Sequence, residues 1–177
     1  IKQIGQGTLG SVFLAEHRFM KRQYLLKLFP EELGSDRGFI QRFEEEVGHL
    51  AALEHSNIVK VHTVSCVNGQ YFLVTDCIVD PLGETTNLSQ YMIAHDEDLD
   101  EDVLLEILRQ VADALDYAHN KVWGGNTLVH GSLKLNNILI GQGKGKIEVF
   151  ISDFGLSRIV GMGAVLSRTY KVLADAL

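Results

Sequence analysis

The segment Gly5-Gln6-Gly7-Thr8-Leu9-Gly10 has the glycine spacing of a loop that closes over phosphate groups. Glycines let the backbone approach a phosphate closely, and the N–H groups of such a loop can bind its oxygens. A dinucleotide site of the Rossmann type would need a helix directly after the loop. Here Ser11-Val12-Phe13-Leu14 follows, which is typical of a strand. The loop is therefore predicted to be a hairpin, and alone it is equally compatible with a purely structural turn.

A lysine in an apolar strand and a glutamate on the next helix are candidates for an ion pair. Lys27 is flanked by Leu25, Leu26 and Leu28. An ammonium in such surroundings needs a partner, because an isolated buried charge is costly. Glu46 borders the apolar stripe of a helix predicted from about residue 36 to 54 and can point inward. That stripe consists of Phe39, Phe43, Val47 and Leu50. We expect Lys27 and Glu46 to pair.

An asparagine and an aspartate near the ends of two short predicted strands are candidate metal ligands. Asn137 begins the strand predicted over 137–140, and Asp153 follows the strand predicted over 146–151. Their oxygen atoms suit Mg²⁺ beside phosphate groups. The histidines and cysteines have no spacing typical of a zinc site.

Short apolar stretches in the first part of the chain predict strands, and periodic stretches in the second part predict helices. Strands are predicted around residue 4 and over 12–14, 24–29, 58–64 and 71–74, with a hairpin turn at 67–70. After Asp80-Pro81-Leu82-Gly83, helices are predicted over 88–94 and about 100–120. The apolar face of the long helix comprises Val103, Ile107, Val111, Ala114, Leu115 and Ala118. This order predicts an α+β fold.

The composition narrows the class of protein. The chain has 177 residues and a net charge of −7, which argues against nonspecific binding to nucleic acid or membrane surfaces. Much of the charge lies in the acidic run from residue 96 to 102, which is typical of a solvated helix start. No apolar run long enough to span a membrane and no signal peptide is visible. Cys66 and Cys77 are expected to be thiols in a reducing compartment such as the cytoplasm.

Taken in this order, the motifs resemble the eukaryotic-like (Hanks-type) Ser/Thr protein kinase family over essentially the whole chain. The resemblance implies a bilobal kinase-like fold. Residues 1–79 would form a first lobe with an antiparallel sheet and one helix. Residues 80–177 would form a partial, mainly helical second lobe that ends at the start of the activation segment. We expect a bacterial origin from the general character of the sequence, although no motif supports that expectation.

The resemblance also implies roles for individual residues. ATP and Mg²⁺ would be the cofactors, and a protein partner or substrate is expected. Lys27 would contact the α- and β-phosphates while pairing with Glu46, and Lys134 would lie near the γ-phosphate. Asn137 and Asp153 would bind Mg²⁺. The remaining nucleotide-binding positions would be Gly5, Gly7, Gly10, Val12, Leu25, the gatekeeper Thr75, the hinge residues Asp76 and Ile78, and Leu139.

Three positions depart from the family pattern. Ser132 stands where the family has the aspartate that accepts the substrate's proton, and a serine hydroxyl is no stronger as a base than the hydroxyl it would deprotonate. Gly131 replaces the adjacent arginine, which pairs with a phosphate on the activation segment. Leu25 replaces a small alanine over the adenine ring, which makes ATP binding less secure because overpacking costs about 1–3 kcal/mol.

Two functions follow from this mixture of retained and lost residues. The first is a pseudokinase that acts through nucleotide-modulated protein interaction. The alternative is a slow but genuine Ser/Thr kinase that transfers the γ-phosphate of ATP to protein hydroxyls. Loss of a positioned base costs about 10²–10⁴-fold in rate, so some activity would remain.

Overall fold

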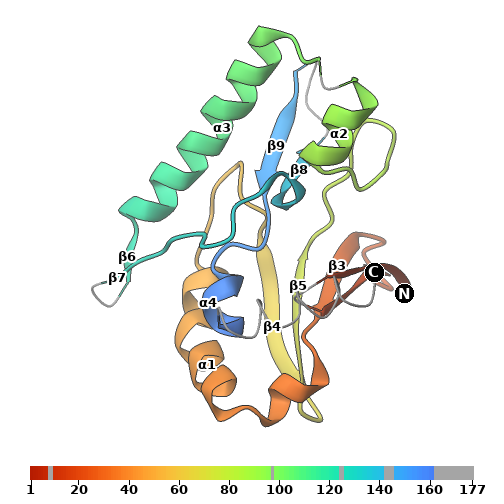
Figure 1. Cartoon of the computed structure of the whole chain (residues 1–177). Helices are drawn as coiled ribbons and strands as arrows, with labels where there is room; N and C mark the ends of the chain where they lie inside the picture. Colours follow the sequence, from red (N-terminus) through yellow and green to blue (C-terminus); the bar gives the residue numbers. More distant parts are fainter. Residues whose placement is uncertain (8–9, 97, 124–125, 142–145, 162–177) are drawn as a thin grey trace, which may run out of the picture. The chain divides into compact units, whose positions relative to one another are not determined.

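The computed structural model describes residues 1–7, 10–96, 98–123, 126–141 and 146–161, which group into two compact units. The first unit comprises Ile1–Ala52, Val61–Asp76 and the described residues from Gly155 onward. The second comprises Leu53–Lys60 and Cys77–Phe154. Figure 1 shows strands β1–β5 with helix α1 in the first unit and the long helix α3 in the second.

The first unit contains a five-stranded antiparallel sheet in the order β1-β2-β3-β5-β4. Its strands are β1 (Lys2–Gly7), β2 (Gly10–Glu16), β3 (Gln23–Leu28), β4 (Val61–Val67) and β5 (Gln70–Asp76). The predicted hairpin turn at 67–70 is confirmed between β4 and β5. Asn68 and Gly69 have φ of 51° and 80°, and two positive values favour Asn-Gly in a tight hairpin.

Helix α1 (Arg37–Ala51) covers an aromatic core in the first unit. It begins after Asp36, whose carboxylate accepts a hydrogen bond from the Phe39 N–H at 2.9 Å. Phe39, Phe43 and Leu50 of the predicted stripe are buried, and Val47 is half-buried. The rings of Phe39 and Phe43 contact Tyr71 at centroid distances of 5.2 and 4.6 Å. The unit also contains η1 (Glu31–Ser35) and the short helix α4 (Leu156–Val160).

The second unit is built from helices around a small strand pair. Its elements are α2 (Leu88–Ala94), α3 (Glu101–Asn120), β6 (Val122–Trp123), β7 (Asn126–Thr127), η2 (Leu135–Asn137), β8 (Ile138–Gly141) and β9 (Glu148–Ile151). Asn87 and Gln90 form a capping box at the start of α2. The core comprises Leu88, Ile107, Ile138, Ile140 and Val149. Both predicted helices and the predicted strand pair are confirmed, and with the antiparallel sheet they confirm the α+β class.

Two predicted boundaries were wrong by three residues. The strand predicted over 58–64 begins only at Val61. The Val59 N–H donates to the Ile151 carbonyl at 2.9 Å, so this segment extends along β9 in the second unit instead. Helix α1 ends at Ala51, three residues before its predicted end at about 54. None of the described helices is long and apolar enough to cross a membrane.

Candidate functional site

The glycine-rich segment forms a hairpin between β1 and β2, as predicted. Gly7 ends β1, Gly10 begins β2, and the two are paired across the strands. Gly10 has φ of 122°, and a Cβ at this position would collide with the carbonyl oxygen of Leu28. Only glycine fits there without displacing the backbone of β3. Thr8 and Leu9 lie outside the described residues, and Gly5 lies within β1.

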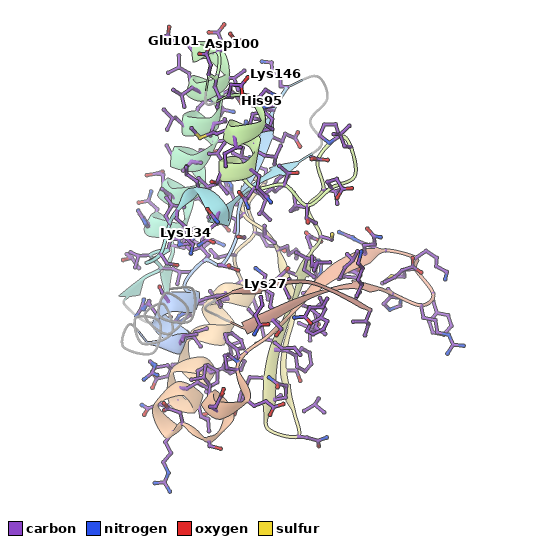
Figure 2. The ribbon with its side chains drawn as sticks, turned by 45° about the vertical axis from the view of Figure 1, so that its right-hand side comes forward. Lys27, His95, Asp100, Glu101, Lys134 and Lys146 are labelled. Carbon is purple, nitrogen blue, oxygen red and sulfur yellow. The ribbon has the colours of Figure 1, made fainter. Side chains whose placement is uncertain are left out.

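The candidate nucleotide-binding residues of β2 and β3 lie next to one another in the sheet. Lys27 on β3 is half-buried. In the sheet it lies opposite Val12 of β2 and Leu73 of β5. Figure 2 labels Lys27 on this strand. Leu25 lies two residues earlier on β3, opposite Thr75 of β5, and is buried with 7% of its surface exposed. Alternation along a strand places Leu25 and Lys27 on the same face.

Glu46 does not have the partner that the sequence predicts. Its Oε1 forms an ion pair with Arg158 Nη2 at 2.9 Å, and its Oε2 lies 3.4 Å from His49 Nδ1. The glutamate side chain is 13% exposed, so a carboxylate there needs a cation or a donor. The Arg158 guanidinium supplies that charge in place of the expected Lys27 ammonium. Arg158 comes from α4, a helix that the sequence analysis did not predict.

A second arginine joins α4 to α1 within the first unit. The Nε of Arg42 on α1 donates to the Ile159 carbonyl at 3.0 Å, and its Nη2 contacts the Val160 carbonyl at 3.5 Å. These carbonyls belong to the C-terminal end of α4, where they have no intrahelical partner. Arg42 and the Glu46–Arg158 pair together fasten the segment after Asp153-Phe154-Gly155 to α1. We call these contacts the α1–α4 latch.

The predicted gatekeeper Thr75 and the hinge residue Asp76 lie at the end of β5, and the hinge residue Ile78 follows the strand. Thr75 is 4% exposed, and its Oγ1 donates to the Asp76 carbonyl at 3.2 Å. The Asp76 carboxylate accepts hydrogen bonds from Arg22 at 2.8 Å and His62 at 2.7 Å. The Asp76 side chain is therefore held against the sheet. Ile78 is half-buried and belongs to the second unit.

The loop around Ser132 is organised by a buried histidine. His130 is 3% exposed, and its Nε2–H donates to the Ser152 carbonyl at 2.9 Å. Its Nδ1 accepts the Ser132 N–H at 3.3 Å, so the ring is neutral with the proton on Nε2. Burial lowers the pKa of His130, which keeps it in this form at neutral pH. Asn137 Nδ2 donates to the Ser132 carbonyl at 3.0 Å. The backbone of Ser132 is thus held from both sides.

The two candidate metal ligands both belong to the second unit. Asn137 is buried, and its carbonyl accepts the N–H of Ser152 at 2.8 Å. Asp153 follows directly and has φ of 61°, a conformation uncommon for a residue with a side chain. The side-chain nitrogen of Asn137 donates its hydrogen bond to the Ser132 carbonyl. Its Oδ1 is therefore the side-chain atom that can accept a hydrogen bond or coordinate a metal ion. These two oxygen-bearing groups fit Mg²⁺, which typically takes few protein ligands beside phosphates and water.

Two further predicted positions lie near this loop. Lys134 is exposed and directly precedes η2 (Figure 2). Leu139 on β8 is half-buried and bridges to Asn87. Among the described residues, no cluster of three or more His, Cys, Asp or Glu side chains could hold a metal ion by itself.

The sequence analysis missed an aspartate that organises the turn after the hinge. Asp80 accepts hydrogen bonds from the Leu82 N–H at 2.8 Å, the Glu84 N–H at 3.0 Å and the Thr86 hydroxyl at 2.6 Å. The bond from Thr86 is the largest cause of its lowered pKa. The Asp-Pro-Leu-Gly pattern was visible as a turn signal, but its capping role depends on Thr86 six residues away.

The protein kinase domain family matches residues 1–172. Serine/threonine-protein kinase pkn1 of Chlamydia caviae is 38% identical over 144 residues, covering 81% of this chain and 22% of the relative. PrkC of Bacillus subtilis is 29% identical over 175 residues, covering 99% of this chain and 25% of that protein. The chain thus spans only about a quarter of the length of these relatives.

A solved structure gives the same assignment. The PknI kinase domain of Mycobacterium tuberculosis has a TM-score of 0.70 and 27% identity, covering 87% of this chain and 58% of that one. The sequence match and the shared fold agree over nearly the whole chain. The chain therefore belongs to the protein kinase family, and its relatives include bacterial Ser/Thr kinases of the Hanks type.

Proposed function

We propose that this chain is a pseudokinase domain that binds a nucleotide and acts through nucleotide-modulated protein interaction. The observation that carries the proposal is Ser132. Its backbone is held by His130 and Asn137 in an ordered loop, yet the side chain is a hydroxyl. An intact loop without a base supports a function that needs binding more than proton transfer.

The nucleotide part of the proposal rests on the retained phosphate and metal positions. When bound, ATP with Mg²⁺ supplies a transferable phosphoryl group and a cation that offsets its charge. Gly10 keeps the hairpin backbone close to β3, where Lys27 offers an ammonium group. Asn137 and Asp153 offer oxygen ligands in the second unit. A protein that never bound a nucleotide would have no physical need for this set.

The α1–α4 latch supports an inactive resting state. Glu46 is paired with Arg158 in this structure, whereas family resemblance assigns it to Lys27. While this pair persists, Glu46 cannot orient the lysine toward phosphates.

We also propose a reducing compartment such as the cytoplasm, supported by Cys66, an exposed thiol.

A slow but genuine Ser/Thr kinase is the second candidate, favoured by the retained Lys134, Asn137 and Asp153. Starting from an ordinary kinase turnover of about 1–100 s⁻¹, loss of the base by about 10²–10⁴-fold leaves roughly 10⁻⁴–1 s⁻¹. Phosphoryl transfer depends mostly on positioning and charge, so this rate need not be zero.

Titration with ATP, with and without Mg²⁺, and a transfer assay with γ-labelled ATP test the two candidates. The pseudokinase proposal predicts Mg²⁺-dependent ATP binding that Lys27→Met weakens, together with negligible transfer of label. Transfer at an ordinary kinase rate that Lys27→Met abolishes would establish the second candidate. Absence of nucleotide binding with and without Mg²⁺ would overturn the nucleotide part of the proposal.

A further inference from the structure

The carboxylate of Asp76, the last residue of β5, is held by side chains from both neighbouring strands. Its Oδ1 accepts a hydrogen bond from Arg22 Nη2 at 2.8 Å and another from His62 Nε2 at 2.7 Å. Arg22 directly precedes β3, and His62 lies on β4. Strands β3 and β4 flank β5 in the sheet. We call Arg22, His62 and Asp76 the β5 clamp.

An aromatic ring holds both donors of the β5 clamp in place. The Arg22 guanidinium lies over the Tyr24 ring, with Cζ 5.5 Å from the ring centroid. The His62 ring meets the same tyrosine edge-on at a centroid distance of 5.2 Å. Tyr24 is itself paired with Asp76 across β3 and β5, and directly opposed residues share one face of a sheet. The ring contacts therefore hold both donors on the face of the sheet where the carboxylate lies.

Strand β4 departs from regular pairing at the residue that supplies one of these donors. Val61 lies opposite Thr75 and Thr63 lies opposite Val74, so β4 has one extra residue between the two pairs. That residue is His62. A β-bulge of this kind bends its strand and changes the direction of a side chain, and bulges are frequent next to functional sites. Here the bulge coincides with the histidine whose ring reaches the carboxylate.

The β5 clamp and the candidate nucleotide-binding side chains occupy opposite faces of the sheet. Leu25 and Thr75 are paired with each other, and each directly adjoins one member of the Tyr24–Asp76 pair. Because successive side chains of a strand point to opposite faces, Leu25 and Thr75 face away from the clamp. The clamp can therefore act on the nucleotide only through the backbone of Asp76.

The backbone carbonyl of Asp76 is a hydrogen-bond acceptor at the end of β5. It accepts the Thr75 hydroxyl at 3.2 Å, and a carbonyl oxygen has two lone pairs, so it can accept a second hydrogen bond. The amino group of a nucleotide base is a donor that suits this acceptor. Since the side chain of Asp76 is also held, the carbonyl is restricted in position before a nucleotide binds, which lowers the cost of binding.

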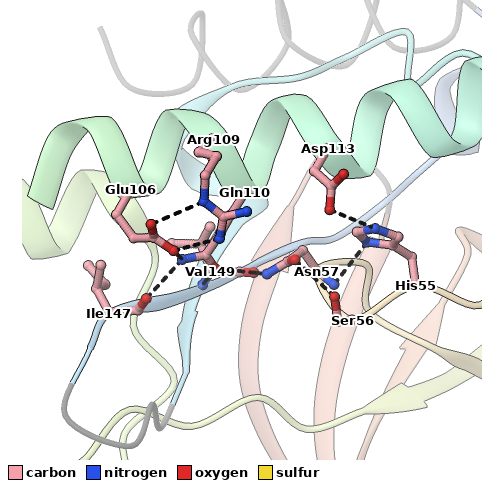
Figure 3. A network of polar contacts seen from close by, with 9 residues as sticks. All are labelled: His55, Ser56, Asn57, Glu106, Arg109, Gln110, Asp113, Ile147 and Val149. Carbon is pink, nitrogen blue, oxygen red and sulfur yellow. Dashed lines mark hydrogen bonds and ion pairs between the residues drawn. The ribbon is translucent and has the colours of Figure 1, made fainter.

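A polar network in the second unit shows how the β5 clamp differs from a contact that only joins elements. Gln110 on α3 donates to the Ile147 carbonyl at 2.9 Å and accepts the Val149 N–H at 3.0 Å (Figure 3). None of the residues that Figure 3 labels is a candidate nucleotide-binding residue. Asp76, in contrast, is one of these candidates, and its side chain is 23% exposed.

We propose that Arg22 and His62 are positioning residues for the nucleotide base. By holding the Asp76 carboxylate, they fix the Asp76 carbonyl as the acceptor for the amino group of adenine. This role rests on the proposed nucleotide binding. When the carboxylate is released, the end of β5 shifts and the hydrogen bond to the base weakens, whereas contacts to the phosphates are kept.

The test compares ATP with inosine triphosphate, in which a carbonyl oxygen replaces the amino group of the base. Dissociation constants of both are measured by titration calorimetry with Mg²⁺ on the complete 177-residue chain. The wild type should prefer ATP about tenfold, which corresponds to about 1.4 kcal/mol, the size of one hydrogen bond. Arg22→Met and His62→Leu should each lower this preference at least about threefold. The loss should lie in the affinity for ATP, with the affinity for inosine triphosphate unchanged.

Matched variants show whether both residues act through Asp76. His62→Gln keeps an N–H donor and should retain the preference that His62→Leu loses. Arg22→Met should cause no further loss once Asp76→Asn has removed the carboxylate, because coupled residues are not additive. Lys21→Met removes the neighbouring cation, which pairs with Glu16 at 3.2 Å, and should leave the preference unchanged.

The possible results distinguish the role of the β5 clamp from the proposed function. If the wild type bound neither triphosphate, the proposed nucleotide binding would fail, and the role of the clamp with it. If the wild type bound ATP and the preference were the same in Arg22→Met and His62→Leu, the clamp alone would be refuted. Equal affinity of the wild type for both triphosphates, or an equal loss of both affinities in folded variants, would also refute it.

Discussion

Ser132 and the aspartate expected at its position differ in one property that matters for phosphoryl transfer, the ability to hold a proton at neutral pH. The Ser132 N–H donates to His130 and the Ser132 carbonyl accepts from Asn137. Both hydrogen bonds involve only the backbone of Ser132, so a substitution of its side chain leaves them in place. The position is therefore suited to restoring a base without remodelling the loop.

We expect Ser132→Asp to raise the rate of phosphoryl transfer by roughly 10²–10⁴-fold, the usual contribution of a positioned base. The rate is measured with γ-labelled ATP and Mg²⁺. Ser132→Asn is the matched control, because asparagine has nearly the same shape as aspartate but no basic oxygen. This variant should not raise the transfer rate. A wild-type rate already typical of kinases, unchanged in Ser132→Asp, would contradict the pseudokinase assignment.

We propose that Leu25 determines how tightly the domain binds a nucleotide. If it overpacks the adenine position at a cost of about 1–3 kcal/mol, Leu25→Ala should strengthen ATP binding by about one to two decades. The measurement is the ATP-induced shift of the melting temperature. Leu26→Ala on the opposite face of β3 is the control and should not improve binding. If Leu25→Ala instead lowers stability by about 2–5 kcal/mol, the value typical of core truncation, and leaves the ATP shift unimproved, Leu25 is a core residue.

Among the elements, helices α1 and α4 hold the first unit in the arrangement seen here. Arg158→Ala removes the cation that pairs with Glu46 at 2.9 Å, leaving a mostly buried carboxylate that seeks another donor. We expect Lys27 to become that donor and ATP affinity to rise about fivefold, the equivalent of about 1 kcal/mol.

The control for this change is the double variant Arg158→Ala with Glu46→Gln. Without a carboxylate at position 46, removal of Arg158 should bring no gain in ATP affinity. Arg37→Ala, which removes an exposed arginine from the first residue of α1, tests whether any loss of positive charge has the same effect. A gain that survives Glu46→Gln would show that the latch does not act through Glu46.

The elements also show where sequence patterns stop being informative. The stripe of α1 and the apolar face of α3 repeat over several turns, so their helices were predictable. Helix α4 contains only Leu156–Val160, too short for a periodic signal, and its stability depends on Arg42 from a distant part of the chain. The partner of Glu46 was therefore mispredicted. Likewise, Asn57 Nδ2 donates to Gln110 Oε1 at 2.8 Å, a contact that no local pattern reveals.

For the whole molecule, the order of the motifs along the chain predicted the protein kinase family, and the family match confirms that prediction. A cavity beside α3 was not predicted. Asp102 in its lining and the acidic neighbours of Asp102 were interpreted as an ordinary solvated helix start, and the apolar lining comes from residues far apart in the sequence: Pro81, Tyr91, Val103, Ile140 and Ile147. Local sequence shows which side chains are apolar or charged, but only the tertiary arrangement shows that they surround a cavity.

The stability of the whole chain should fall in two steps as the pH is lowered, and both steps originate in the second unit. Burial lowers the pKa of His130 below its ordinary value of 6.5. As the pH falls below about 6.5, the unfolded chain binds a proton at this histidine before the folded chain does, so the free energy of unfolding decreases.

The second step comes from carboxylates. Hydrogen bonds from Arg109 and Gln110 lower the pKa of Glu106 from 4.5 to about 2, and the bond from Thr86 leads the lowering of the pKa of Asp80 from 3.8. Their contribution to stability is complete above these ordinary values and is lost as the pH falls toward the folded-state values. Glu106→Gln should therefore reduce the loss of stability below about pH 4.5 and leave the first step unchanged.

Thermal unfolding measured from pH 8 to pH 3 resolves the two steps. His130→Phe should flatten the curve between about pH 7 and pH 5, since phenylalanine does not titrate. The variant should also melt at a lower temperature at every pH, because the Ser152 carbonyl and the Ser132 N–H lose their partner. Hydrogen exchange at pH 5 should show the wild-type loss of protection beginning around His130 in the second unit. If His130→Phe lost as much stability between about pH 7 and pH 5 as the wild type, the first step would have to come from another titrating group.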